Sequence, residues 1–132
     1  MRFDIDGATF ETLDGFFDVA SQTLAPGKPV RRDLNGFDRI LRGGLGPAGS
    51  EATLVWANSE KSRWDLGYAE TLRVLQARLD QVPAPQRAFV LADIANAEAG
   101  QGATVYDWVV DVIARHGPGG PAEEDNIRLV LD

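Results

Sequence analysis

Hydrophobic residues follow two spacings along this chain, and each spacing predicts a different secondary structure. Residues 1–6 alternate, with Phe3 and Ile5 between polar neighbours, and residues 127–131 alternate in the same way. A period of two is typical of a β-strand with one buried face. Residues 52–57 form a nearly continuous apolar run, which predicts a strand buried on both faces. We therefore expect three strands.

Between these segments, apolar residues recur every three or four positions, as on the buried face of an amphipathic helix. The clearest stripe covers residues 13–24, where Thr12 is the expected N-cap. A short helix is predicted over residues 34–41, capped by Asp33. Three further helices are predicted over residues 68–82, 86–98 and 105–116.

The order of these elements predicts the fold class. Long helical connections separate the three strands, and strands joined in this way run parallel. The chain has 132 residues, which suits one domain with an ordinary hydrophobic core. We expect a single α/β domain over residues 1–132, built on a three-stranded parallel sheet packed with helices.

Composition and charge narrow the chemistry that this chain offers. It has no cysteine and one histidine, His116, which excludes disulfides, a cysteine nucleophile and any metal site with two imidazoles. We expect no cofactor and no metal. The 20 acidic and 13 basic residues give a net charge of −7, which repels nucleic-acid backbones and favours a basic protein partner. Since no segment resembles a signal peptide or a membrane span, we expect a cytoplasmic protein.

Three glycines, Gly44, Gly46 and Gly49, match the spacing of the dinucleotide-binding fingerprint. That fingerprint needs a strand before the glycines and a helix after them, so that the helix N-terminus meets the pyrophosphate. Here a predicted helix precedes the glycines and a predicted strand follows them. The segment is therefore interpreted as a flexible connection.

The last predicted helix carries polar residues that allow more than one interpretation. His116 lies in its final turn, where a cation meets the negative end of the helix dipole, and this favours a structural role. Asp107 and Asp111 lie four residues apart on the face opposite the apolar stripe. They form either a solvated face or a carboxylate pair offered to a basic partner. Nothing in the sequence supplies the pocket that acid–base catalysis by this pair requires.

The short helix over residues 34–41 has regular apolar spacing on one side and a dense polar face on the other. A helix of this length has little stability of its own, so packing must hold it in place. It is interpreted either as a solvated connector or as an exposed recognition helix that follows an ordered loop.

The residues of this helix, Asp-Leu-Asn-Gly-Phe-Asp-Arg-Ile-Leu over 33–41, resemble the second helix of the barstar family, the intracellular inhibitors of barnase-type bacterial ribonucleases. The following Arg-Gly-Gly-Leu-Gly is similar to the sequence after that helix in longer barstar-related proteins. The first strand and helix, and the last helix and strand, resemble the two ends of the family's chain. Residues 60–101 are extra to the minimal inhibitor and form a predicted helical insertion.

The resemblance implies a barstar-like fold and a mode of action. A ribonuclease active site is a cationic cleft that binds phosphates, and such an inhibitor plugs it by presenting carboxylates, with complementary charge giving fast association. The resemblance therefore implies an immunity-type protein without enzymatic activity, which binds a basic ribonuclease inside the cell that makes it.

The implied contact surface is the loop and helix over residues 30–42, flanked by the last helix. Asp33 and Asp38 would offer charge, Asn35 a hydrogen bond, and Arg39 a pairing with an acidic residue of the target. Asn35 and Arg39 stand where family members carry carboxylates, which changes the site that the scaffold presents. Replacing Asp33 and Asp38 by alanine is predicted to abolish binding and to leave the thermal midpoint nearly unchanged. The predicted partner-binding residues are Val30, Asp33, Asn35, Asp38, Arg39, Asp107 and Asp111.

Three other interpretations stay open at this stage. A barstar-like interaction module with a non-nuclease partner would bind with weak salt dependence. A nucleic-acid-associated protein would use Arg31, Arg32, Arg39 and Arg42, and would retard generic RNA in a mobility-shift experiment. An enzyme is the least favoured, because the sequence offers no nucleophile–base pair, metal set or phosphate loop. The sequence determines neither the partner's identity nor the oligomeric state.

Overall fold

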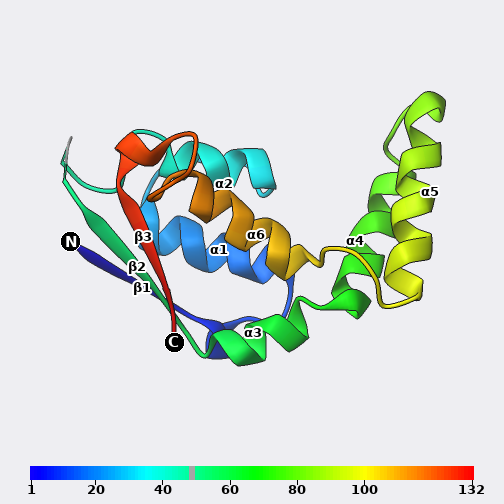
Figure 1. Ribbon diagram of the computed structural model, residues 1–132, viewed down its shortest axis with the longest axis horizontal. Helices are drawn as coiled ribbons and strands as arrows, with labels where there is room; N and C mark the ends of the chain where they lie inside the picture. The colour runs from blue at the N-terminus through cyan, green and yellow to red at the C-terminus, as the bar shows by residue number, and fades with distance from the viewer. Residues whose placement is uncertain (48–49) are drawn as a thin grey trace.

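Three parallel strands lie in the order β1–β2–β3 in the computed structural model, which describes residues 1–47 and 50–132 (Figure 1). The strands are β1 (Arg2–Asp6), β2 (Ala52–Ala57) and β3 (Ile127–Leu131). Their register places Ile5 beside Trp56 and Trp56 beside Leu131, so side chains of one face line up across the sheet. The predicted α/β fold with a three-stranded parallel sheet is confirmed.

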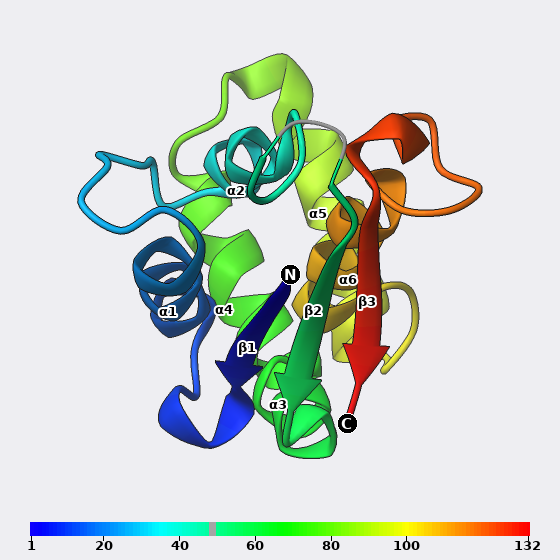
Figure 2. The same ribbon diagram turned by 90° about the vertical axis from the view of Figure 1, so that its left-hand side faces the viewer.

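Helices fill both connections between the strands. In Figure 2 the strands lie in front of the helices, so the helices cover one face of the sheet. Between β1 and β2 lie η1 (Gly7–Thr9), α1 (Leu13–Leu24) and α2 (Leu34–Leu41). Between β2 and β3 lie α3 (Ser59–Asp65), α4 (Tyr68–Leu79), α5 (Ala84–Glu98), α6 (Val105–Arg115) and η2 (Glu123–Asp125).

Side-chain N-caps account for the starts of three helices, and two of them, Thr12 and Asp33, were predicted. Thr12 accepts a 3.0 Å hydrogen bond from the Gly15 N–H at the start of α1, and Asp33 caps α2. Thr104 and Asp107 form a reciprocal capping box at the start of α6. Each side chain satisfies a backbone N–H that has no partner within its own helix.

The core centres on Trp56 of β2, whose side chain is fully buried. The Phe16 ring of α1 stacks on it with centroids 5.1 Å apart, and Phe37 of α2 meets Phe16 edge-on at the same separation. The indole N–H of Trp56 donates a 3.0 Å hydrogen bond to the Ser62 hydroxyl, so this polar group is satisfied inside the core. α1 and α2 thus dock on the sheet through aromatic contacts.

The two helices α4 and α5 form a hairpin that stands away from the sheet (Figure 1) and holds its own small apolar cluster. α4 reaches the rest of the molecule through hydrogen bonds to helix N-termini. The Leu13 N–H of α1 donates to Glu70 Oε2 at 2.8 Å, and the Val105 N–H of α6 donates to the Thr71 hydroxyl at 3.0 Å. Glu70 and Thr71, which lie in the predicted insertion, therefore cap α1 and α6.

Some element boundaries differ from the predicted ones. α3 was not predicted, since it is short and polar, and Asn58 before it takes a left-handed conformation (φ 55°) without a side-chain cap. α4 ends at Leu79 because the chain then turns, with the Val82 N–H bonded to the Arg78 carbonyl. α5 begins at Ala84 instead of residue 86.

Gly49 of the glycine spacing lies outside the described residues, while Gly44 and Gly46 follow α2 and adopt positive φ. Within the described ranges, no helix combines the length and apolar character that a membrane crossing needs. In the same part of the chain, no group of three or more His, Asp or Glu side chains is arranged so that it could hold a metal ion.

Candidate functional site

Helix α2 lies at the surface in contact with α1 and α6, and its sequence explains how it is held. Phe37 and Leu41, four residues apart, are buried in the core. At the N-cap, the Gly36 N–H donates a 2.7 Å hydrogen bond to the Asp33 carboxylate. Only glycine fits at position 36, because a Cβ atom there would overlap the Arg31 carbonyl oxygen. A helix this short depends on such tertiary contacts.

A buried histidine joins the C-terminal ends of α2 and α6. His116, the C-cap of α6, is only 3% exposed. Its Nδ1 lies 2.6 Å from Asp125 Oδ2, and its Nε2 lies 2.7 Å from Asp38 Oδ1. Both ring nitrogens therefore lie within hydrogen-bond distance of a carboxylate oxygen. We call the Asp38–His116–Asp125 arrangement the histidine clamp.

Two further hydrogen bonds extend the histidine clamp. Arg42 donates to Asp38 Oδ2 at 2.9 Å, and the Gly43 N–H donates to Asp125 Oδ1 at 3.0 Å. Burial would raise the pKa of Asp38, but hydrogen bonds from His116 and Arg42 outweigh burial and hold this pKa below its ordinary value. The clamp therefore fixes the end of α2 through an ionised carboxylate, and His116 has a structural role.

One flank of α2 faces α6 across a groove of about 320 Å³, which we call the α2–α6 groove. Asn35 and Asp38 line it from α2, and Asp111 and Arg115 line it from α6. The half-buried Trp108 provides an apolar surface in the same groove. Two carboxylates and a carboxamide thus face one hollow, with a guanidinium beside them.

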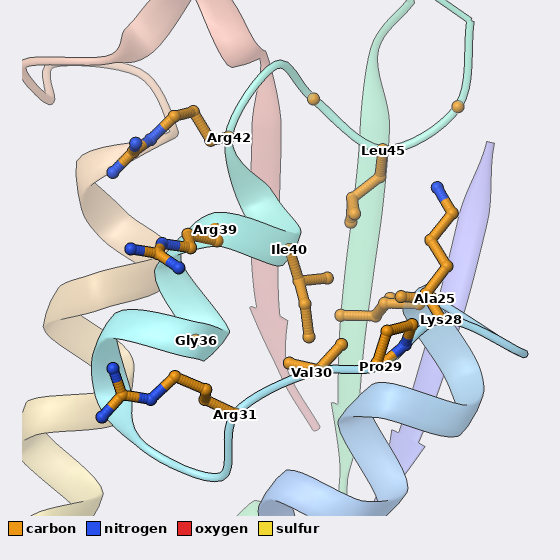
Figure 3. A pocket seen from close by; sticks show the side chains of 13 residues that line it. Ala25, Lys28, Pro29, Val30, Arg31, Gly36, Arg39, Ile40, Arg42 and Leu45 are labelled. Carbon is orange, nitrogen blue, oxygen red and sulfur yellow. The ribbon is translucent and has the colours of Figure 1, made fainter.

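The other flank of α2 borders a cavity of about 590 Å³, which also touches the end of α1 and the loop after it (Figure 3). We call it the arginine cavity, because Lys28, Arg31, Arg39 and Arg42 line it. The predicted acidic recognition helix therefore presents a cationic flank as well.

The structure divides the predicted contact surface. Asn35, Asp38 and Asp111 share the α2–α6 groove, whereas Val30 and Arg39 line the arginine cavity on the opposite flank. These predicted partner-binding residues therefore line two different hollows beside α2, and their role in binding a partner stays a prediction.

Three of the four predicted carboxylates bond within the chain. Asp33 caps α2 and pairs with Arg31 at 3.1 Å. Asp38 belongs to the histidine clamp, and Asp107 accepts the Thr104 N–H in the capping box of α6 at 2.9 Å. The predicted behaviour of the Asp33 and Asp38 double variant is corrected on this geometry. Since both carboxylates support the fold, their removal lowers the thermal midpoint.

Asp111 differs from these three. It is exposed, and within residues 1–47 and 50–132 it makes no hydrogen bond or ion pair. Trp108 and Arg115 share its groove and were not predicted as site residues. Their spacing from Asp111, three residues before it and four after it, would have placed them on the same side of a helix. Asp38 and His116 are 78 positions apart in the sequence, so no local sequence pattern predicts their hydrogen bond.

Comparison with known proteins adds no relative to this picture. No protein-family model matches the chain, and no curated protein and no solved structure matches it. The geometry of the two flanks of α2 is therefore the main evidence for a function.

Proposed function

We propose that this chain is an immunity-type inhibitor that binds a bacterial ribonuclease in the cytoplasm of the cell that makes it. The contact surface is the α2–α6 groove and the exposed edge of α2 above it. The observation that carries the proposal is that Asp38 and Asp111, from different helices, face one groove together with Asn35. Asp111 offers an exposed carboxylate to a cleft that binds phosphates, and Asp38, which is held by His116 and Arg42, adds negative charge beside it. The resemblance to barstar implies the same mode of action.

Rigidity of the site supports this role. The histidine clamp fixes α2 against α6, so the groove does not have to be ordered when the partner binds, and less entropy is lost on association. The lowered pKa of Asp38 keeps that carboxylate charged at neutral pH. Charge complementarity with a basic cleft raises the association rate and makes binding sensitive to salt.

The contacts of the His116 ring favour a binding protein over an enzyme. Both ring nitrogens already contact carboxylates, and the side chain is buried. A general base needs a free nitrogen within reach of the proton that it removes. We therefore propose a non-enzymatic role.

A second candidate function rests on a different observation. Asp33, Asp38 and Asp107 all bond within the chain, which leaves Asp111 as the predicted carboxylate with the most freedom. This favours a barstar-like interaction module with a non-nuclease partner. Such a module would bind with less salt dependence than a charge-steered inhibitor.

A titration against an active barnase-type ribonuclease, at low and at physiological salt, tests the proposal. We expect stoichiometric inhibition that weakens as salt rises. Asp111→Asn should raise the inhibition constant by about fivefold to tenfold, because it removes an unpaired carboxylate from the contact. Asp93→Asn on α5 is the matched control, since this exposed carboxylate lies outside the α2–α6 groove, and it should change the constant by less than about twofold.

Two outcomes would contradict the proposal. No inhibition at either salt concentration would exclude this class of target and favour the interaction module. Equal changes of the inhibition constant in Asp111→Asn and Asp93→Asn would show that the α2–α6 groove is not part of the interface. The inhibition constant would then depend only on the net charge of the chain.

A further inference from the structure

The arginine cavity concentrates positive charge on a chain whose net charge is −7. Lys28, Arg31, Arg39 and Arg42 line it, and no acidic side chain of the described residues does. Arg31 pairs with Asp33, and Arg42 pairs with Asp38. Within the described part of the chain, Lys28 and Arg39 form no ion pair. Two cations are therefore available to a ligand without breaking an existing contact.

The cations flank an apolar centre. In Figure 3, Arg31, Arg39 and Arg42 extend to one side of α2, while Val30, Ile40 and Leu45 lie between them and Lys28. Leu45 is buried, and Val30 and Ile40 are partly buried. The volume of about 590 Å³ is large enough for an amino-acid side chain with its neighbours.

The absence of a side chain at Gly36 shapes this cavity. The Arg31 carbonyl lies so close to Gly36 that no Cβ atom fits between them. The loop after α1 is therefore pressed against α2, and the Arg31 guanidinium is brought to the same rim as that of Arg39. The cationic rim is a product of this close contact and not of adjacent positions in the sequence.

We propose that the arginine cavity binds an acidic segment of a partner protein, with an apolar side chain in its centre and carboxylates on its rim. Guanidinium groups match carboxylates in geometry as well as in charge. A nucleic-acid strand fits less well, because the chain as a whole repels phosphates and the cavity has no aromatic ring among its described lining residues on which a base could stack.

This inference does not depend on the proposed ribonuclease. The arginine cavity and the α2–α6 groove are lined by different residues, and the Arg42–Asp38 ion pair is the contact that joins a residue of one to a residue of the other. Occupation of the cavity by a carboxylate segment leaves Asp111 and Asn35 accessible. The chain would then bring two proteins together, or hold one partner that carries both a basic cleft and an acidic extension.

The test uses the full chain labelled with nitrogen-15 and observed by NMR at physiological salt. The probe is the acetylated, amidated peptide Asp-Glu-Leu-Leu-Glu-Asp, and its control is Asn-Gln-Leu-Leu-Gln-Asn. We expect saturable shifts of the amides of Val30, Gly36 and Leu45 with the acidic peptide alone. Arg39→Gln should weaken the dissociation constant at least about fivefold, as expected for loss of a charge-assisted contact.

Arg87→Gln provides the matched control, because this exposed arginine of α5 lies outside the cavity and its replacement changes the net charge equally. Its dissociation constant should stay within about twofold of the parent value. Absence of saturable shifts, or equal weakening by both variants, would overturn the inference. Stronger binding of an oligouridylate of six nucleotides at the same amides would also overturn it and identify the cavity as a nucleic-acid site.

The two proposals fail separately. Arg39→Gln that abolishes peptide binding and leaves ribonuclease inhibition intact would support the cavity as a second site. Loss of ribonuclease inhibition in Asp111→Asn with unchanged peptide binding would support the α2–α6 groove alone. A parent chain that inhibits no ribonuclease but binds the acidic peptide would refute the proposed function and leave the cavity assignment in place.

Discussion

Replacement of His116 tests whether the histidine clamp holds α2 in position. His116→Ala removes both hydrogen bonds of the imidazole and leaves two carboxylates with fewer donors. The side chain of Asp125 is 9% exposed and that of Asp38 is 22% exposed. Asp125 keeps the Gly43 N–H, and Asp38 keeps Arg42. The variant therefore measures the cost of removing the imidazole from two carboxylates that are buried or partly buried.

The magnitude follows from those contacts. A hydrogen bond to a charged group contributes about 1.5–3 kcal/mol, and removal of one partner from a buried pair costs about 3–5 kcal/mol. We expect His116→Ala to lower the free energy of unfolding by about 3–5 kcal/mol. For a domain of this size about 3 °C of thermal midpoint corresponds to 1 kcal/mol, so the midpoint should fall by roughly 9–15 °C.

Two further variants separate the halves of the histidine clamp. The amide nitrogen of His116→Asn lies close to the position of Nδ1 and keeps a donor for Asp125, whereas that of His116→Gln lies closer to Nε2 and keeps a donor for Asp38. Because Asp125 is the more buried carboxylate, losing its donor costs more. The expected order of destabilisation is Ala, then Gln, then Asn.

Guanidinium chloride unfolding, followed by tryptophan fluorescence and circular dichroism, measures these differences. The comparison should be repeated at acidic pH. Because the folded pKa of Asp38 is lowered, its contribution is complete above the ordinary value of 3.8 and is lost as pH falls through the folded pKa. The gap between parent and His116→Ala should therefore narrow below about pH 4. A gap below about 1 kcal/mol at pH 7, or the same loss in all three variants, would refute the clamp.

Two more predictions concern the caps that hold α1 and α2. Glu70→Gln should cost about 1–2 kcal/mol at pH 7, since the buried carboxylate accepts the Leu13 N–H and pairs with Arg73. Burial would raise the pKa of Glu70, but the hydrogen bonds from Arg73 and Leu13 lower this pKa overall. The loss of stability in Glu70→Gln should therefore become smaller below about pH 4.5, the ordinary pKa, when urea unfolding is measured at a series of pH values. A loss of stability that does not change with pH would contradict this. Asp33→Ala should lower the free energy of unfolding by about 1 kcal/mol because α2 loses its N-cap, and Asp33→Ser should be nearly as stable as the parent chain because serine also caps a helix. Equal chemical-denaturation midpoints for the two variants would rule out a stabilising cap at this position.

Local signals explain which elements were predictable. Helix α1 combines an apolar stripe with a Thr12 cap, and the observed bounds match the predicted range of 13–24. Helix α3 has neither signal, since the residues that it buries are the polar Ser59 and Ser62 and a left-handed Asn58 without a side-chain cap precedes it. Its exposed Trp64 also shows that a large apolar residue does not by itself mark a buried position.

The candidate site shows the same division. Asp38 has the sequence environment of a solvated carboxylate on a helix surface, and only the fold brings His116 to it from 78 positions away. Arg39 and Lys28 similarly become neighbours of one cavity only after the loop between them turns against Gly36. Contacts of this kind depend on chain reversals that no local pattern encodes.

The sequence alone determined the number of strands, their parallel arrangement and the N-caps of α1 and α2, because hydrophobic periodicity and capping residues act over a few positions. Tertiary structure decided how the charges are used. It brought Asp38 to a buried histidine, left Asp111 exposed in a groove, and placed four cationic residues along one cavity. The physical reason is that the energy of a charge depends on its burial and on the partners that folding brings within hydrogen-bond distance.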